Sequence, residues 1–218
     1  MGSSPTPATK QFIMNSLTDK QIEKILLGSQ ESVEANKERQ KNMDNAYYHN
    51  KLSSVVIGKI AEHEWKNYLN KFDIAFKSTA SSFTNEGSDC YIGDDQIEVK
   101  ANAWFMIAPD HIEKYRANDS TLVWYNVYLP TKKDEPVTIE HIKNSQSRLL
   151  GYNNIIDFDD AVFLEHDLSC PTEKKPYRKT KRSNYWLPEW EKKNGRPIKD
   201  LIGKYNGKEV GFEQVGLI

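Results

Sequence analysis

The sequence has little cysteine, no long apolar run and no glycine-rich phosphate loop. Its two cysteines, Cys90 and Cys170, lie far apart in the chain, so they cannot form a zinc cluster by themselves and are expected to be free thiols in a reducing cytoplasm. No stretch approaches the length of a membrane span, and the N-terminus lacks the basic-then-apolar order of a signal peptide. We therefore expect a cytoplasmic protein with no membrane partner and no ATP-driven activity of its own.

Motifs of other common catalytic sites are also missing. The five histidines are scattered without the His-x-x-x-His spacing of a zinc site, and there is no nucleophile elbow of a serine hydrolase. We expect His63 and His111, on predicted helices, to be packing or surface residues. The acidic cluster of Asp157, Asp159 and Asp160 resembles a metal site in composition, but a solvated loop is the preferred interpretation.

The net charge of −1 conceals an asymmetry along the 218 residues. Residues 171–208 contain twelve lysines and arginines against four aspartates and glutamates, a local charge of +8 that leaves −9 for the remainder. A basic segment on an acidic body is typical of a nucleic-acid enzyme, whose metal site needs carboxylates while its rim needs cations. A solvated, flexible tail is the alternative.

Composition and hydrophobic spacing divide the chain into four parts. Residues 1–10, rich in serine, proline and threonine, are expected to be a disordered leader. A helical segment at 11–52 precedes a core at 53–168, and a basic and aromatic extension occupies 169–218. The aromatics of this extension fit either stacking on bases or packing onto the body. Its candidate DNA-binding cations are Arg178, Lys179, Lys181 and Arg182.

Hydrophobic spacing predicts helices in the first third of the chain. A capping box predicts a short helix over 18–27 that Gly28 and Ser29 interrupt, and a polar stretch with helical composition follows at 31–48. Residues 53–68 predict an amphipathic helix with one apolar face. The residues of that face are Val56, Ile60, Trp65 and Leu69.

Strand signals dominate from the middle of the chain onward. Strands are predicted over 72–78 and 96–104, and an almost wholly apolar run at 121–129 predicts a central strand buried on both faces. Proline in a first turn favours a helix over 109–115. Beyond residue 130 the alternation of apolar and polar residues is weaker. The elements predicted there are short strands at 137–142 and 161–164 and a helix near 141–150.

The segment 87–101 is the most informative part of the chain. It predicts two short strands joined by a turn at 93–95. Because side chains alternate along a strand, Glu98 and Lys100 point away from the apolar residues between them. A charged pair on an otherwise apolar strand is costly unless it is paired, binds a metal or does chemistry. The turn can bring Asp89 alongside, and the three side chains then form a divalent-metal site with a proton handler beside it.

The order helix, strand, strand, strand, helix, strand over 53–129 resembles the core of the PD-(D/E)xK nuclease superfamily. Its motif here is Ser88-Asp89, eight intervening residues, then Glu98-Val99-Lys100, with Ser88 where the family usually has proline. The resemblance implies an α/β fold with a mixed sheet and a restriction-endonuclease-like αβββαβ core. The N-terminal helical segment and the C-terminal basic segment are then extensions of that core.

A second matching feature lies in the helix before the first strand. Gly58-Lys59-Ile60-Ala61-Glu62 is similar to the Gly-x-x-x-Glu with which many members place another acidic residue near the metal. We prefer Glu62 to Glu64, because two residues along a helix point to different faces. Gly58 would allow this helix to approach the sheet closely.

The resemblance implies hydrolysis of DNA phosphodiester bonds with Mg²⁺, for which Mn²⁺ is an expected substitute. Asp89 and Glu98 would be metal ligands, and the carbonyl of Val99 would add a third. Lys100 would position the attacking water and stabilise charge in the transition state, while its role as the base stays open. Glu62 would bind a second metal or orient its water.

Several functions stay open within and beyond this family. The size and the flanking segments favour a type II restriction-like endonuclease that acts on double-stranded DNA as a homodimer. A Holliday-junction resolvase and a phage or repair exonuclease are the alternatives with the same fold, and a non-catalytic DNA-binding module is the alternative from another class. If there is no site, Asp89 is a turn cap and Glu98 and Lys100 form an exposed pair at a sheet edge.

Overall fold

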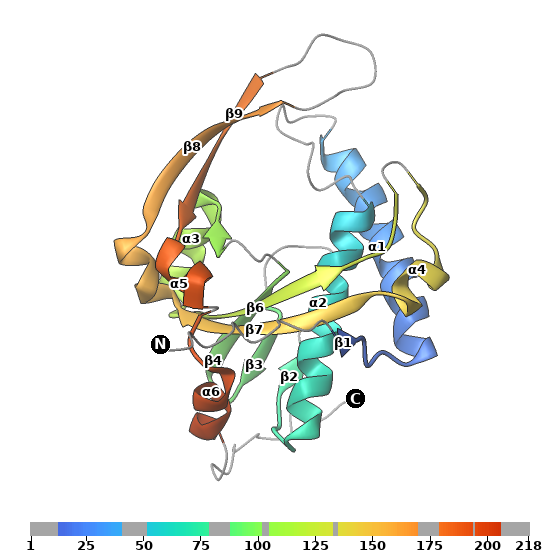
Figure 1. Cartoon of the computed structure of the whole chain (residues 1–218), viewed down its shortest axis with the longest axis horizontal. Coiled ribbons are helices and arrows are strands. Elements are labelled where there is room, and N and C mark those ends of the chain that lie inside the picture. The colour runs from blue at the N-terminus through green and yellow to red at the C-terminus, as the bar shows by residue number, and fades with distance from the viewer. Residues whose placement is uncertain are drawn as a thin grey trace, which may run out of the picture.

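Two β-sheets and the helices around them give the chain a mixed α/β fold (Figure 1). The main sheet has six curled strands, and its two central neighbours β4 and β6 are parallel while the other neighbouring strands are antiparallel. The computed structural model describes residues 13–40, 52–78, 88–101, 105–132, 135–169, 179–193 and 195–205.

Each sheet combines strands that are distant in the sequence. In the order in which they lie, the strands of the main sheet are β1 (Ile13–Met14), β7 (Gln146–Asn154), β6 (Thr121–Tyr128), β4 (Asp95–Lys100), β3 (Cys90–Ile92) and β2 (Lys77–Ser78). Those of the smaller antiparallel sheet are β5 (Met106–Ile107), β9 (Lys179–Trp186) and β8 (Val162–Ser169). The helices are α1 (Asp19–Gln40), α2 (Leu52–Lys71), α3 (Pro109–Ala117), α4 (Ile139–Lys143), α5 (Pro188–Lys193) and α6 (Ile198–Tyr205), with a 3₁₀ helix η1 (Ile155–Asp160).

Helix α1 begins at the predicted capping box but runs farther than predicted. The Thr18 backbone N–H donates to Gln21 Oε1 at 2.8 Å, and the Gln21 N–H donates to Thr18 Oγ1 at 3.3 Å. The predicted interruption at Gly28 and Ser29 is wrong, since the helix continues to Gln40 and Ser29 is fully buried. Packing along α2 outweighs the helix penalty of about 1 kcal/mol that glycine carries.

Helix α2 covers one face of the main sheet. Its four predicted core residues are all fully buried, which confirms the amphipathic pattern. Trp65 and Leu69 pack with the strand residues Ile97, Val99 and Val123, and α6 joins the same apolar cluster. Leu201, Ile202 and Tyr205 of α6 are buried there, so this part of the C-terminal segment belongs to the main core.

The opposite face of the sheet carries a second apolar cluster. Trp124 of β6 is fully buried between Phe105 and Phe158, with ring centroids 4.7 and 6.3 Å away. Ile112 and Tyr115 of α3 complete its centre. The predicted helix over 109–115 and the predicted central strand over 121–129 are therefore both confirmed, and they place a helix directly over the parallel strand pair.

Several predicted elements differ from those observed. The strand predicted over 72–78 is reduced to its last two residues, β2, and the strand predicted over 96–104 ends at Lys100 as β4. The strand at 137–142 and the helix near 141–150 are wrong, because α4 and the long strand β7 occupy these positions. β7 pairs with β6 along its whole length, and this long-range pairing decides its conformation.

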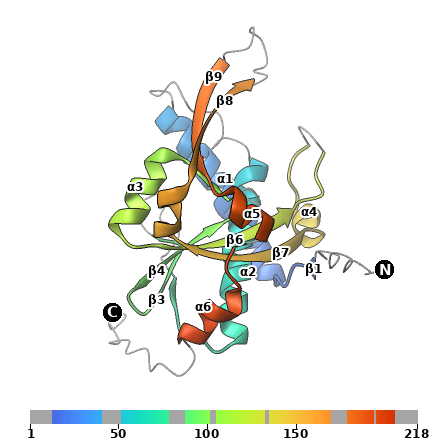
Figure 2. The ribbon, with the colours of Figure 1, turned by 60° about the vertical axis from the view of Figure 1, so that its left-hand side comes forward.

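The C-terminal segment adds an extended arm to the molecule. Strands β8 and β9 pair from Val162–Trp186 outward to Ser169–Lys179, and this hairpin projects from the body in both views (Figures 1 and 2). Tyr185 and Trp190 pack against the cluster around Trp124, as expected if the aromatics of this segment wrap the body. No helix among the described residues is long and apolar enough to cross a membrane.

Two aspartates of the 3₁₀ helix η1, Asp157 and Asp159, form ion pairs. Asp157 accepts from Arg196 Nη2 at 2.6 Å and Nε at 3.2 Å, and also from the backbone N–H of Asn154 at 3.1 Å. Its side chain is only 10 % exposed, whereas Asp159, paired with Arg116 at 2.7 Å, is 58 % exposed. The predicted solvated loop is therefore wrong for Asp157.

Asp157→Ala is expected to lower the free energy of unfolding by about 2 kcal/mol, because it leaves Arg196 and two amide donors without their acceptor. Asp159→Ala is the matched control, and we expect it to change the free energy of unfolding by less than about 0.5 kcal/mol, since exposed ion pairs contribute little. Urea unfolding measures both. If Asp157→Ala changes the free energy of unfolding as little as Asp159→Ala, the hydrogen bonds and the ion pair of Asp157 do not stabilise the fold.

Candidate active site

The β3–β4 hairpin brings the predicted site residues together. Its tight turn places Gly93 at a φ of 60°, in the left-handed region that glycine adopts readily. Cys90 pairs with Ile97 in the antiparallel register, and the preceding residue Asp89 therefore lies opposite Glu98. Residues directly opposite each other project on the same face of a sheet. The hairpin thus places the two carboxylates side by side.

A hydrogen bond fixes Asp89 against the neighbouring strand. The backbone N–H of Val99 donates to Asp89 Oδ2 at 2.6 Å. Asp89 therefore accepts from the middle of β4 and does not serve as a cap for the β3–β4 turn. This contact holds one carboxylate oxygen within reach of the Glu98 and Lys100 side chains.

Glu98 and Lys100 form a buried pair on a central strand. Lys100 Nζ lies 3.2 Å from Glu98 Oε2, and the two side chains are 23 % and 5 % exposed. Strand β4 lies between β6 and β3, so the alternative of an exposed pair at a sheet edge is excluded. Glu98 Oε1 is buried and has no hydrogen-bond partner within the described part of the chain. A buried carboxylate oxygen of this kind costs free energy unless it binds a ligand.

Tyr115 is a member of the site that the sequence did not indicate. It comes from α3, is almost fully buried, and its ring centroid lies 4.9 Å from Lys100 Nζ. Such a distance is typical of a cation–π contact. The spacing of Ile112 and Tyr115 on a predicted amphipathic helix indicates that both face inward, but not that one of them meets Lys100.

Burial and neighbouring charges raise the pKa values of Glu98, Glu62 and Lys100. Burial is the main cause for Glu98 and Glu62, and in both the charge of Asp89 raises the pKa further. Burial alone would lower the pKa of Lys100, but Tyr115, Asp89 and Glu98 outweigh this and raise it. Lys100 is therefore a protonated cation at neutral pH, suited to stabilising negative charge and unsuited to removing a proton.

Glu62 and Glu64, two residues apart on α2, have different partners. Both Glu62 oxygens accept from Lys59 Nζ, at 2.9 and 2.8 Å, and its pKa responds to Asp89. Glu64 instead accepts from the backbone N–H and hydroxyl of Ser16, at 2.7 and 3.1 Å. The suggested role of Gly58 is wrong, because a Cβ there would meet no heavy atom within 4 Å.

The described residues contain no group of three histidine, cysteine, aspartate or glutamate side chains that could hold a metal ion. A site for Mg²⁺ needs fewer, since this ion keeps several waters and binds one or two carboxylates. The unpaired Oε1 of Glu98, with Asp89 beside it, fits that requirement. Glu98 and Asp89 would hold the ion.

Three of the four predicted DNA-binding cations lie on a strand of the second sheet, away from Asp89 and Glu98. Lys179, Lys181 and Arg182 belong to β9, in the projecting hairpin, and Arg178 lies outside the described residues. His63 is partly buried in α2, where burial lowers its pKa to about 4, and His111 is exposed on α3. Both histidines occupy the packing and surface positions expected of them.

No protein-family model, curated protein or solved structure matches this chain. The function is therefore argued from the geometry of the site and from the chemistry of its residues.

If the protein cleaves DNA with Mg²⁺ as the sequence predicts, Glu62→Gln is expected to slow cleavage by about 10- to 100-fold, because it removes a negative charge beside the predicted metal ligands. Glu64→Gln is the matched control, two residues along the same helix, and should retain the rate of the unmodified protein. Initial rates of plasmid nicking at several Mg²⁺ concentrations measure both. If Glu64→Gln is the slower variant, the assignment of Glu62 is wrong.

Proposed function

We propose that this protein is a Mg²⁺-dependent endodeoxyribonuclease that hydrolyses phosphodiester bonds of double-stranded DNA. The observation that carries the proposal is the buried Glu98 carboxylate, which has one oxygen paired with Lys100 and the other without a partner, on a central strand beside Asp89. A buried carboxylate oxygen left without a partner costs free energy, which a bound cation would recover. Two carboxylates and a lysine in this arrangement suit metal-assisted hydrolysis.

The order of elements supports a restriction-endonuclease-like core. Helix α2, strands β2, β3 and β4, helix α3 and strand β6 follow one another, apart from the short β5 that joins the second sheet. Starting from the β2 edge of the main sheet, neighbouring strands are β2, β3, β4 and β6, which is also their order along the chain. Helices α2 and α3 lie on opposite faces of this sheet. This order of elements along the chain supports the proposed core.

The residues of the site would divide the reaction among them. Asp89 and Glu98 would hold the ion, and Glu62 would orient a water. Bound Mg²⁺ would polarise the scissile phosphate and lower the pKa of a coordinated water. Lys100, held protonated by the carboxylates, stabilises the negative charge that develops on the phosphate oxygens. Tyr115 holds the Lys100 ammonium in place.

Nicking of supercoiled plasmid tests the proposal. We expect relaxed and then linear DNA with Mg²⁺ or Mn²⁺, and unchanged plasmid when EDTA removes the metal. Discrete fragments would indicate a restriction-type enzyme, which is expected to be a homodimer so that each site cuts one strand. Mononucleotides would indicate an exonuclease, and resolved junctions a resolvase. Binding of duplex without any metal-dependent cleavage would overturn the proposal in favour of a non-catalytic DNA-binding module.

A further inference from the structure

The main sheet has one face that the apolar clusters cover only in part. Val127 of β6 packs with the α2 side of the sheet, and the hydroxyl of Ser147 on β7 hydrogen-bonds to Glu64 of α2. Their strand neighbours Asn126 and Arg148, which are paired with each other across β6 and β7, therefore project on the opposite face.

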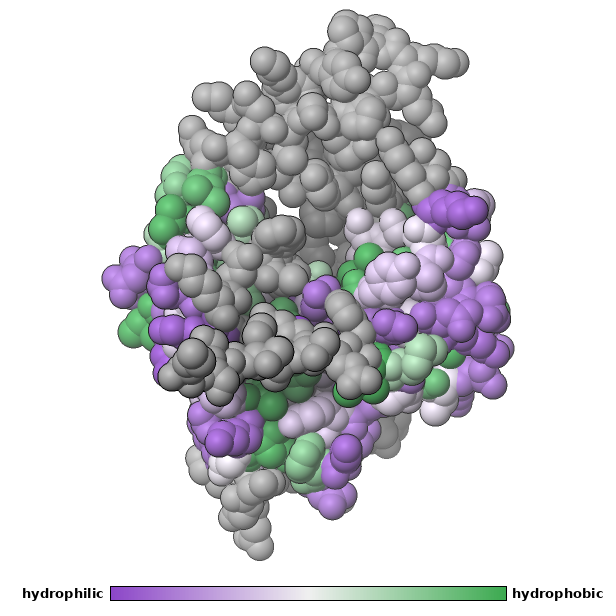
Figure 3. Space-filling view, viewed as in Figure 1, coloured by the Kyte–Doolittle hydropathy of each residue, from purple (hydrophilic) through white to green (hydrophobic). Residues whose placement is uncertain are grey.

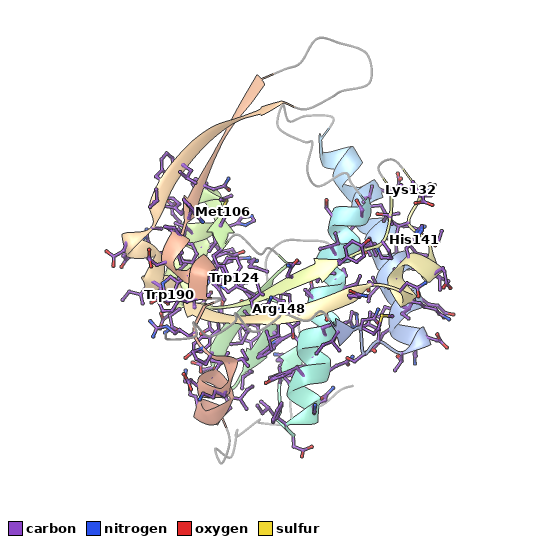
Figure 4. The ribbon with its side chains drawn as sticks, in the orientation of Figure 1. Met106, Trp124, Lys132, His141, Arg148 and Trp190 are labelled. Atoms are coloured by element: carbon purple, nitrogen blue, oxygen red, sulfur yellow. The ribbon has the colours of Figure 1, made fainter. Side chains whose placement is uncertain are left out.

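That opposite face is also the face of the candidate active site. Ile97 and Val99 pack toward α2, so Glu98 and Lys100 point away from it. In the parallel register, Lys100 lies beside Trp124, and Asn126 follows two residues along the same strand and on the same face. The position of Trp124 and Arg148 on neighbouring strands can be followed in Figure 4.

The part of this face beyond Trp124 has a polar character. α3 and η1 cover the half that holds Leu122 and Trp124. The next residues on the same face are Asn126 and Arg148, both partly buried, and Tyr128, which is 54 % exposed. Where described residues are visible in the space-filling view, hydrophilic and hydrophobic side chains are interspersed over the surface (Figure 3). The composition suits a polar ligand better than an apolar protein surface.

Arg148 differs from the other arginines whose side chains the structure describes. Arg116 and Arg196 each pair with an aspartate, at 2.7 and 2.6 Å. Arg148 has no ion pair and no side-chain hydrogen bond among the described residues, although it is partly buried. A guanidinium presents several donors in a planar fork that matches phosphate oxygens. An unpaired one beside an amide side chain and an exposed aromatic ring is suited to a nucleic-acid backbone.

We propose that Arg148, with Asn126 beside it, binds a backbone phosphate of the DNA strand that is cut at Glu98 and Lys100. Strand spacing of about 4.8 Å and a rise of about 3.3 Å per residue place the Cα atoms of Arg148 and Lys100 roughly 12 Å apart. On that scale, the bound phosphate lies within a few nucleotides of the scissile bond on the same strand. The inference rests on the proposed function for its substrate.

The test measures binding of a 30-base-pair duplex by fluorescence anisotropy in EDTA, between about 50 and 200 mM salt. Arg148→Met is expected to weaken binding about tenfold at the lowest salt and to reduce the slope of log K against log salt by about 0.9, the value for one lost phosphate contact. Arg148→Lys should restore much of the slope, because it keeps the charge. Arg116→Met, which removes an arginine paired with Asp159, is the control and should bind like the unmodified protein.

The outcomes separate this inference from the proposed nuclease activity. A protein that cleaves DNA but whose Arg148→Met variant keeps the full salt slope would overturn the inference and leave the nuclease standing. If the unmodified protein does not cleave DNA, but Arg148→Met reduces the slope of log K against log salt, the binding surface is supported and the proposed nuclease activity is overturned. As a control for folding, the urea midpoint of each variant should agree with that of the unmodified protein within error. If Arg148→Met is destabilised, Arg148→Gln replaces it.

Discussion

Glu98→Gln is expected to reduce the rate of Mg²⁺-dependent DNA cleavage by about 10²- to 10³-fold, the range found when one preorganised electrostatic group is removed. Glutamine keeps the size of glutamate but supplies no negative charge to a metal ion. Burial already raises the pKa of this carboxyl, and a glutamine oxygen can still accept from Lys100, so we expect a smaller loss of stability than complete removal of a partner from a buried ion pair causes. Lys100 keeps Asp89 and Tyr115 as neighbours.

The measurement compares plasmid nicking rates with urea unfolding of the same preparations. Glu23→Gln, the same substitution at an exposed position of α1, is the matched control and should leave both quantities unchanged. Nicking by Glu98→Gln at the rate of the unmodified protein would remove Glu98 from the reaction. A large loss of stability in this variant would instead identify the Glu98–Lys100 pair as a structural ion pair.

The positions of site residues that are close together in the chain could be predicted from the sequence. Alternation along a strand requires only neighbouring residues, so Glu98 and Lys100 could be placed on one face, and the turn at Gly93 could be placed from its residues. Tyr115 could not be assigned, because its contact with Lys100 depends on the way α3 crosses the sheet. The unpaired oxygen of Glu98 is likewise a property of the packed structure.

Long-range pairing decided the elements that the sequence misplaced. Residues 146–150 have no strict alternation and were predicted to be helical, yet they form β7 because the exposed edge of β6 offers a complete ladder of backbone hydrogen bonds. A register shift between Trp124 and Tyr125 adds one residue to β7 and further obscures its pattern. In α1, burial of Ser29 against neighbouring elements overrides the local preference for a break.

Trp124→Ala is expected to lower the free energy of unfolding by about 3–5 kcal/mol, the usual cost of truncating a large buried aromatic residue. Trp124 is fully buried and contacts Phe105 and Phe158, so truncation of its side chain leaves a cavity between these two rings. Trp190→Ala is the control. Trp190 is only partly buried at the margin of the same cluster, and its truncation should cost about half as much or less.

The position of Trp124 links this core to the candidate active site. Trp124 is paired with Lys100 in the parallel register of β4 and β6, so a cavity at Trp124 opens beside the lysine of the candidate active site. We therefore expect Trp124→Ala to lose cleavage activity at temperatures below its unfolding transition, while Trp190→Ala keeps it. Circular dichroism and plasmid nicking over the same temperature range separate the two effects. If activity and fold are lost together in both variants, the cluster around Trp124 stabilises the protein without positioning Lys100.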